Sequence, residues 1–254
     1  MIILYYIDCH AHDKRGEKMD FLEYDGLLTG YIGLDRQVVV PEGIHTIDNE
    51  AFASVSYITS VKLPYGLCMI NDYAFQDCEM LESINIPETV IFIGPHAFEG
   101  CLKLKEIEIP MSVTHLCDNV FENCGLEKIK LHDEITSMGT AVFCGCNKIK
   151  ELTVPRGITE IPEGGFIGMT GLESVTLHDK IESIGENGFF GCYMLKEIFI
   201  PKSVEKIGMG AFGCCPNLKI YAEAKEKPSG WEVDGLTVVW KASLPLEGKG
   251  DRNH

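Results

Sequence analysis

The 254-residue sequence has few basic side chains, with 22 lysines and arginines against 38 aspartates and glutamates and a formal net charge of −16. A phosphate backbone or an anionic membrane surface would repel most of such a molecule, because like charges oppose association. Nucleic acid is therefore excluded as the expected partner.

Long hydrophobic runs are also missing. The sequence has no stretch of 18 or more apolar residues, which excludes a membrane-spanning helix. Its opening residues, MIILYYI, lack the basic region and the length of a secretory signal. We therefore expect a chain that is cytoplasmic as written, with its compartment otherwise unknown.

The usual catalytic signatures are absent as well. The sequence contains no glycine-rich phosphate loop, no Ser-His-Asp set and no paired carboxylates that a fold would bring together in a cleft. We expect the many carboxylates to form a solvent-exposed face of the protein. We therefore expect no enzymatic activity and no cofactor.

What the sequence has instead is one unit repeated eight times. Its phenylalanines recur at steps of 23 residues, with a single step of 22, at Phe52, Phe75, Phe98, Phe121, Phe143, Phe166, Phe189 and Phe212. A fixed period of this length is typical of repeat architectures, in which each unit stacks on its neighbours.

Each unit contains the pattern of two short strands. Apolar residues at alternate positions, such as Ile84 and Ile86, predict the first strand, and a proline or, at His132 and His178, a histidine follows it at a corner. Apolar residues three apart predict a second extended segment. A column of turn residues then predicts a short helical turn, which carries an Ala-Phe pair and ends at residue types that accept a left-handed conformation.

One unit has too few inward side chains to enclose a core, so neighbouring units must stack. We therefore predict a β-rich repeat solenoid of eight 23-residue coils with short helical turns, capped at both ends. The expected parts are a disordered extension or wrongly assigned start before Met19 at 1–18, an N-terminal cap at 19–37, the solenoid at 38–218, a C-terminal cap at 219–242 and a flexible tail at 243–254.

The recurring pattern Leu-x-x-Ile-x-Ile-Pro-x-x-Val-x-x-Ile-Gly-x-x-Ala-Phe-x-x-Cys resembles the BspA-type leucine-rich repeat, and Leu81 to Cys101 matches it almost position for position. The resemblance covers the chain from Val38 to Leu218. Relatives of this type are known mostly as bacterial cell-surface and adhesion proteins. The resemblance thus implies a non-catalytic monomer that binds a protein or a cell-surface ligand, and a passive structural or spacer solenoid is the alternative.

The variable outward positions of a solenoid are where selectivity can reside, because packing determines the inward positions. On the first strands, the outward row has one aromatic residue, Phe199, with Thr176, Thr153 and Lys130 running away from it along the sheet. These four residues are the predicted binding surface. A solvated sheet with one isolated apolar residue is the competing interpretation.

Eleven cysteines raise the question of disulfides or metal binding. Six of them share one repeat position with Val55 and Met169, namely Cys78, Cys101, Cys124, Cys146, Cys192 and Cys215. A position that accepts valine and methionine is a packing position, so we expect buried, free thiols. No cysteines have the paired spacing of a zinc site.

The one enzymatic alternative lies at the N-terminus, where an apolar run ends in Asp8-x-His10-x-His12. This resembles the first-strand His-x-His motif of the amidohydrolase superfamily, which implies a metal-dependent hydrolase whose metal, bound by His10 and His12, activates water. Further ligands would have to come from later strands of a barrel, whereas the later chain here is committed to coils. We therefore expect no metal site.

Overall fold

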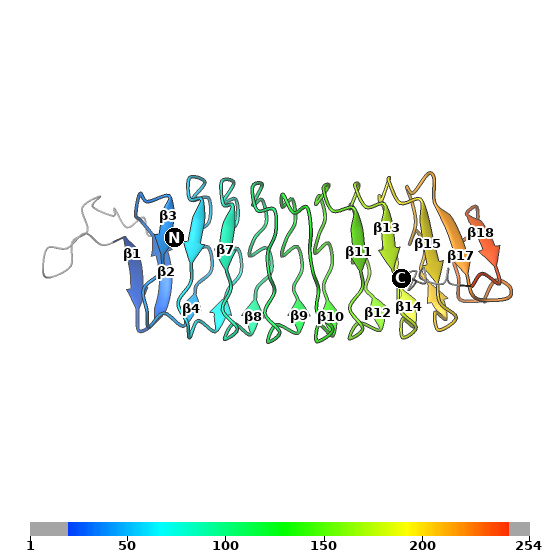
Figure 1. Ribbon diagram of the computed structural model, residues 1–254, viewed down its shortest axis with the longest axis horizontal. Coiled ribbons are helices and arrows are strands. Elements are labelled where there is room, and N and C mark those ends of the chain that lie inside the picture. Colours follow the sequence, from blue (N-terminus) through cyan, green and yellow to red (C-terminus); the bar gives the residue numbers. More distant parts are fainter. Residues whose placement is uncertain (1–19, 244–254) are drawn as a thin grey trace, which may run out of the picture.

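The computed structural model describes residues 20–243, which wind into a solenoid of about nine stacked coils. Figure 1 shows the coils following one another along the long axis, from the blue N-terminal end to the red C-terminal end. The extension at 1–18, with His10 and His12, lies outside the described residues, as does the tail from residue 244 onward.

Most coils contribute one strand to each of two surfaces, and we call these the first and second sheet surfaces. The first surface comprises β3 (Gln37–Val39), β5 (Ser60–Lys62), β7 (Ser83–Asn85), β11 (Glu151–Thr153), β13 (Ser174–Thr176), β15 (Glu197–Ile200), β17 (Lys219–Ala222) and β18 (Thr237–Trp240). The second comprises β4 (Thr46–Ile47), β6 (Met69–Ile70), β8 (Phe92–Ile93), β9 (His115–Leu116), β10 (Ser137–Met138), β12 (Glu160–Ile161), β14 (Ser183–Ile184) and β16 (Lys206–Ile207).

The strands pair in parallel with equivalent residues side by side. Val61 lies opposite Ile84, and Ile161 lies opposite Ile184, so the register follows the 23-residue step of the sequence. Because a parallel pair keeps the alternation of inward and outward side chains, every inward column becomes one continuous buried row. The predicted solenoid of stacked short strands is confirmed.

The repeated phenylalanines form that core. Phe52, Phe75, Phe98, Phe121 and Phe143 are fully buried, and the centroids of successive rings among them lie 4.8, 5.4, 5.8 and 5.7 Å apart. Interplanar angles of 14° or less make these rings parallel stacks. The stacked column adds aromatic contact energy to the burial of apolar area.

A hairpin covers the N-terminal end of the stack. Its strands, β1 (Phe21–Tyr24) and β2 (Leu27–Tyr31), are antiparallel, and β2 continues into the second sheet surface by pairing with β4. The Tyr31 ring stacks on Phe52 at 5.4 Å. The tyrosine therefore extends the aromatic column and shields its first phenylalanine.

Two tryptophans close the other end. Trp231 is almost fully buried, and its indole nitrogen donates a hydrogen bond of 3.1 Å to the carbonyl oxygen of Val204. Its ring lies 5.7 Å from that of Trp240 on the last strand, β18. The polar edge of the large side chain is thus satisfied while its rings cover the final coil.

The short helical turn predicted after the second strand is not found in residues 20–243, where this segment is a series of hydrogen-bonded turns. The N–H groups of Ala51, Ala53 and Val55 bond three residues back, whereas those of the alternate residues bond to the next coil. For example, the N–H of Phe52 donates a hydrogen bond of 2.8 Å to the carbonyl oxygen of Ala74 on the next coil. A helix would need all of these donors within its own segment, so coil stacking has replaced it.

Backbone dihedrals show where the helix is prevented. The residues expected to accept a left-handed conformation at the end of the turn all have positive φ, namely Ser54, Asp77, Gly100, Asn123, Gly145, Gly168, Gly191 and Cys214. A second left-handed column, four positions earlier, was not predicted and includes unfavourable types such as Tyr73 and Ala141. Inter-coil hydrogen bonds offset its steric cost, which is about 1–2 kcal/mol per residue.

His132 and His178 stand at corners where the other coils have proline. Each forms a side-chain hydrogen bond that a proline could not form. The Nε2 of His132 lies 2.9 Å from the Pro110 carbonyl oxygen, and that of His178 lies 2.8 Å from the Pro155 carbonyl oxygen. Both imidazoles therefore tie their own corner to the preceding coil.

The first sheet surface is interrupted in the middle of the stack. It consists of a sheet of β3, β5 and β7 and a separate sheet of β11, β13, β15, β17 and β18. Between them, an isolated bridge joins Glu108 and Lys130. The interruption falls where the repeat is 22 residues long, because this coil has only Gly125 between Cys124 and Leu126 where its neighbours have two residues.

Candidate functional site

Three of the four predicted binding residues share one sheet. Thr153 and Thr176 are exposed and lie directly opposite each other on β11 and β13. Phe199 follows on β15, which pairs with β13 so that Val175 and Ile198 point inward together. Phe199 is half-buried, whereas its neighbours Ile198 and Ile200 are fully buried, so its ring lies on the outward side of the strand.

Lys130 does not belong to that sheet. Its side chain is exposed, but the residue lies in no strand and only forms the isolated bridge with Glu108. The prediction of one uninterrupted row was wrong at this point. Lys130 lies in the short coil, five residues after Gly125.

The row continues in the opposite direction through two residues that the repeat pattern alone did not indicate. Tyr221 on β17 lies opposite Phe199, and Val239 on β18 lies opposite Tyr221. The Lys219 ammonium lies 5.0 Å from the centre of the Tyr221 ring, within the range of a cation–π contact. The signal was available in LKIYAEA, which resembles the start of a ninth coil.

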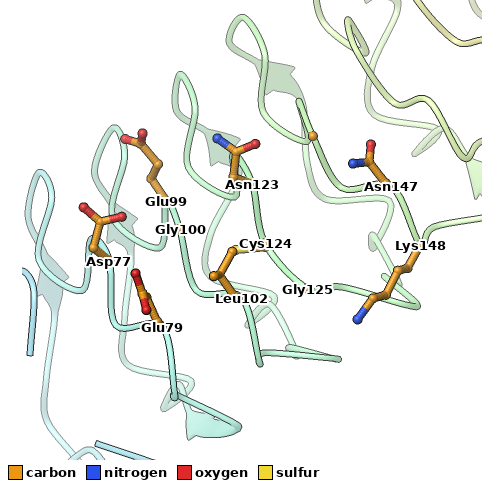
Figure 2. A pocket seen from close by; sticks show the side chains of 11 residues that line it. Asp77, Glu79, Glu99, Gly100, Leu102, Asn123, Cys124, Gly125, Asn147 and Lys148 are labelled. Carbon is orange, nitrogen blue, oxygen red and sulfur yellow. The ribbon is translucent and has the colours of Figure 1, made fainter. Parts of the chain in front are cut away.

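A groove of about 480 Å³ opens at the corner of the short coil. Leu102 and Cys124 lie near its centre in Figure 2, with Gly125 beside them, while the equivalent corner of the next coil carries Asn147 and Lys148. Because Gly125 replaces two residues, the corner of its coil is shorter than those on either side. The groove is lined by residues of this short corner and of the coils on either side.

The groove is predominantly acidic. Asp77, Glu79 and Glu99 line one side in Figure 2, and Lys148 lies on the other. With ionised side chains, three carboxylates and one ammonium leave two net negative charges. Leu102, which is 50% exposed, adds an apolar surface between them.

The cysteine beneath the groove is structural. The thiol of Cys124 donates a hydrogen bond of 2.9 Å to the Phe98 carbonyl oxygen, and the surrounding apolar groups raise the pKa of this thiol well above its ordinary value. Desolvation acts in the same direction on Cys146, whose pKa rises to about 12. Such thiols stay protonated near neutral pH and are poor nucleophiles and metal ligands. All cysteines within residues 20–243 are free, as predicted.

One set of side chains in the described part of the chain could hold a cation. His96, Glu99 and Glu122 each offer one donor atom, and these atoms all lie within 4.8 Å of one another. The N-terminal histidines of the hydrolase alternative, His10 and His12, lie outside the described residues.

Solved structures of repeat proteins have the same fold. A leucine-rich repeat protein from Bacteroides ovatus ATCC 8483 aligns over 87% of this chain and 68% of its own, with a TM-score of 0.70 and 24% identity. The T. pallidum leucine-rich repeat protein aligns over 76% of this chain and 82% of its own, with a TM-score of 0.53 and 27% identity. No curated protein matches the sequence.

The family model of the BspA type leucine rich repeat region matches six copies, over residues 35–150 and 114–225. The matched region contains all eight repeated phenylalanines. No helix within residues 20–243 has both the length and the hydropathy needed to cross a bilayer. The match extends over most of the chain, which therefore belongs to the BspA-type leucine-rich repeat family.

Proposed function

We propose that this chain is a non-catalytic module that binds a protein through the outward row of its first sheet surface. The binding row consists of Thr153, Thr176, Phe199, Tyr221 and Val239. Membership of a leucine-rich repeat family and the similarity to solved repeat proteins support a role in protein interaction. Proteins of this family are generally non-catalytic. Lys130 remains a candidate contact at the edge of the row.

The proposal rests on the change in side-chain type along the binding row. Two small hydroxyl side chains are followed by Phe199, Tyr221 and Val239, which present partly exposed aromatic and apolar surface on consecutive strands. Aromatic side chains are enriched at protein interfaces, and tyrosine contributes a large contact area with little loss of side-chain entropy. The small threonines leave room for a partner backbone beside these anchors.

Rigidity of the sheet favours the same function. Strand β15 is paired on both sides, with β13 and with β17, so the backbone beneath Phe199 is fixed before any partner arrives. A preorganised surface loses less conformational entropy on binding than a flexible loop does. The partner that suits it is a protein segment with an apolar side chain to place against the Phe199 and Tyr221 rings.

Capture from lysate and surface fractions of the source organism tests the proposal. The full chain is immobilised beside a Thr176→Glu, Phe199→Ser variant, and a Glu160→Lys variant on the second sheet surface serves as the control. We expect one protein to be held by the full chain and the control and lost by the double variant, with unchanged circular dichroism for all three.

Two further results are informative. A Lys130→Glu variant that also loses the partner would extend the interface across the interruption in the sheet. Equal, non-specific recovery by every variant would overturn the proposal and favour the passive structural or spacer solenoid. Hydrolysis of amide or ester substrates that depends on His10 and His12 would instead support the metal-dependent alternative.

A further inference from the structure

Three side chains of metal-ligating types, His96, Glu99 and Glu122, meet on the turn segments of two neighbouring coils. The Nδ1 of His96 lies 2.8 Å from Oε2 of Glu99, and one carboxylate oxygen of Glu122 completes a set whose atoms are all within 4.8 Å of one another. All three side chains are half-buried. The set is therefore a shallow site with defined walls.

The stacking of coils brings this set together. His96 and Glu99 lie in the turn segment after β8, and Glu122 occupies the same repeat position as Glu99 in the segment after β9. The backbone of the two segments is bonded directly, since the N–H of Phe98 donates to the Val120 carbonyl at 3.0 Å. Glu122 thus approaches His96 and Glu99 from the neighbouring coil.

Neighbouring side chains hold the donors in place. The His96 ring stacks on Tyr73, with centroids 4.6 Å apart and an interplanar angle of 9°. Gln76 donates a hydrogen bond of 3.0 Å to Glu99, and Asn119 donates one to Glu122. Outer partners of this kind orient metal ligands and reduce the entropy lost when an ion binds.

The charge of the set also points to a cation. Glu99 and Glu122 carry two negative charges side by side, and neither forms an ion pair with a lysine or arginine in residues 20–243. A divalent ion would neutralise both carboxylates at once.

We propose that His96, Glu99 and Glu122 bind a divalent transition-metal ion of the zinc class through one imidazole nitrogen and two carboxylate oxygens. Tetrahedral ligand atoms about 2.1 Å from one ion lie about 3.4 Å apart. That spacing falls between the 2.8 Å of the His96–Glu99 pair and the 4.8 Å limit of the set. An imidazole ligand favours zinc-class ions over calcium and magnesium, which prefer oxygen ligands throughout.

The bound ion would join two coils. In its absence, the proton of the His96–Glu99 hydrogen bond links residues of one coil only, and an ion at Nδ1 takes the place of that proton. Glu122 then becomes linked to His96 and Glu99 through the ion. Because the coil of Glu122 is also the short one, the ion would tie the interrupted region of the solenoid to the coil before it.

Calorimetric titration of the full chain with Zn²⁺ alone, under reducing conditions, tests the site. We expect His96→Ala and Glu122→Gln each to weaken one binding event at least about tenfold. Zn²⁺ should raise the melting temperature of the unsubstituted chain and have less effect on that of either variant. The matched control is His115→Ala, which removes an exposed histidine from β9 and should leave the binding event intact.

Two controls separate this site from other donors. A His10→Ala, His12→Ala variant should retain the event, and Co²⁺ in place of Zn²⁺ should show no thiolate charge-transfer band, because the set contains only nitrogen and oxygen donors. Glu122→Gln keeps the shape of the side chain and guards against loss of folding. Binding that is unchanged in both His96→Ala and Glu122→Gln, or that is lost with the N-terminal histidines, would overturn the proposal.

Discussion

The thiol of Cys146 donates a hydrogen bond of 3.0 Å to the carbonyl oxygen of Phe121, one coil earlier. The same carbonyl oxygen also accepts a hydrogen bond from the N–H of Cys124 at 3.2 Å. One oxygen of the phenylalanine column therefore binds two residues of the cysteine column. Other cysteines of the column bond to the phenylalanine of the preceding coil in the same way, as Cys78 does to Phe52. Cysteine is thus favoured here as a small apolar residue that also satisfies a buried acceptor.

Truncating the aromatic column should destabilise the whole stack. Phe121 is fully buried and stacked on both sides, so Phe121→Ala should lower the free energy of unfolding by about 3–5 kcal/mol. Tyr65→Ala is the control, because this side chain is 80% exposed, and its effect should stay within about 0.5 kcal/mol. Urea denaturation measures both values. Equal losses would contradict the inward assignment of the column.

Alkaline pH should weaken the fold through the buried thiols. Burial raises the pKa of Cys146 to about 12 in the folded chain, whereas an unfolded cysteine ionises near pH 8.5, roughly. The neutral, buried Cys146 thiol therefore makes its full contribution to stability below about pH 8.5. This contribution is lost as the pH rises toward the pKa of the thiol in the folded chain, and the free energy of unfolding falls by up to about 1.4 kcal/mol per pH unit for one thiol.

Urea unfolding at pH 8 and pH 10 measures this dependence. Cys146→Val places at this position the residue type found at Val55 and removes one titrating group. The variant should show a smaller loss of stability between the two pH values than the unsubstituted chain. An identical decrease in the free energy of unfolding in both proteins would show that Cys146 is not the cause of the pH dependence.

Thiol reagents should distinguish the two adjacent cysteines at the C-terminal end. Cys214 is exposed, whereas Cys215 is buried and its pKa is raised to about 11 by desolvation. In the folded chain, we expect a disulfide reagent to modify Cys214 rapidly and Cys215 only at the rate of unfolding. Peptide mapping after timed quenching measures the two rates. Comparable rates in native buffer would argue against the burial of Cys215.

The short corner should tolerate no side chain. A Cβ at Gly125 would lie 2.1 Å from the carbonyl oxygen of Leu102, which is backbone and cannot turn away. Gly125→Ala should therefore destabilise the protein by about 1–3 kcal/mol. Lys103→Ala, at an exposed corner position of the preceding coil, is the control and should have little effect. Thermal melts compare them, and equal melting temperatures would mean that the corner can relax.

Much of the fold could be predicted because inward positions repeat. The alternation at Ile84 and Ile86, and its recurrence at each step, indicated strands stacked in register. The left-handed column that includes Ser54 and Asp77 was also predictable from its residue types. The helical turn was wrong because local residue preferences do not reveal that every second N–H would find a partner on the next coil.

The candidate sites depended more on the three-dimensional arrangement. Lys130 was placed in the binding row because the repeat pattern alone does not show that the strand ladder is broken at its coil, where the residue forms only an isolated bridge with Glu108. Tyr221 was missed because its coil is not a full repeat. The set of His96, Glu99 and Glu122 spans two coils, so no local motif could indicate it.

The period, the inward columns and hence the stacked solenoid follow from the sequence alone, because each unit repeats the same inward apolar positions and can bury them only against its neighbours. The three-dimensional arrangement was needed to show which side chains of neighbouring coils meet, how the turn segments distribute their hydrogen bonds, and where the groove beside the short coil lies. These outcomes depend on contacts between coils and on distances of a few ångströms, which spacing along one chain does not specify.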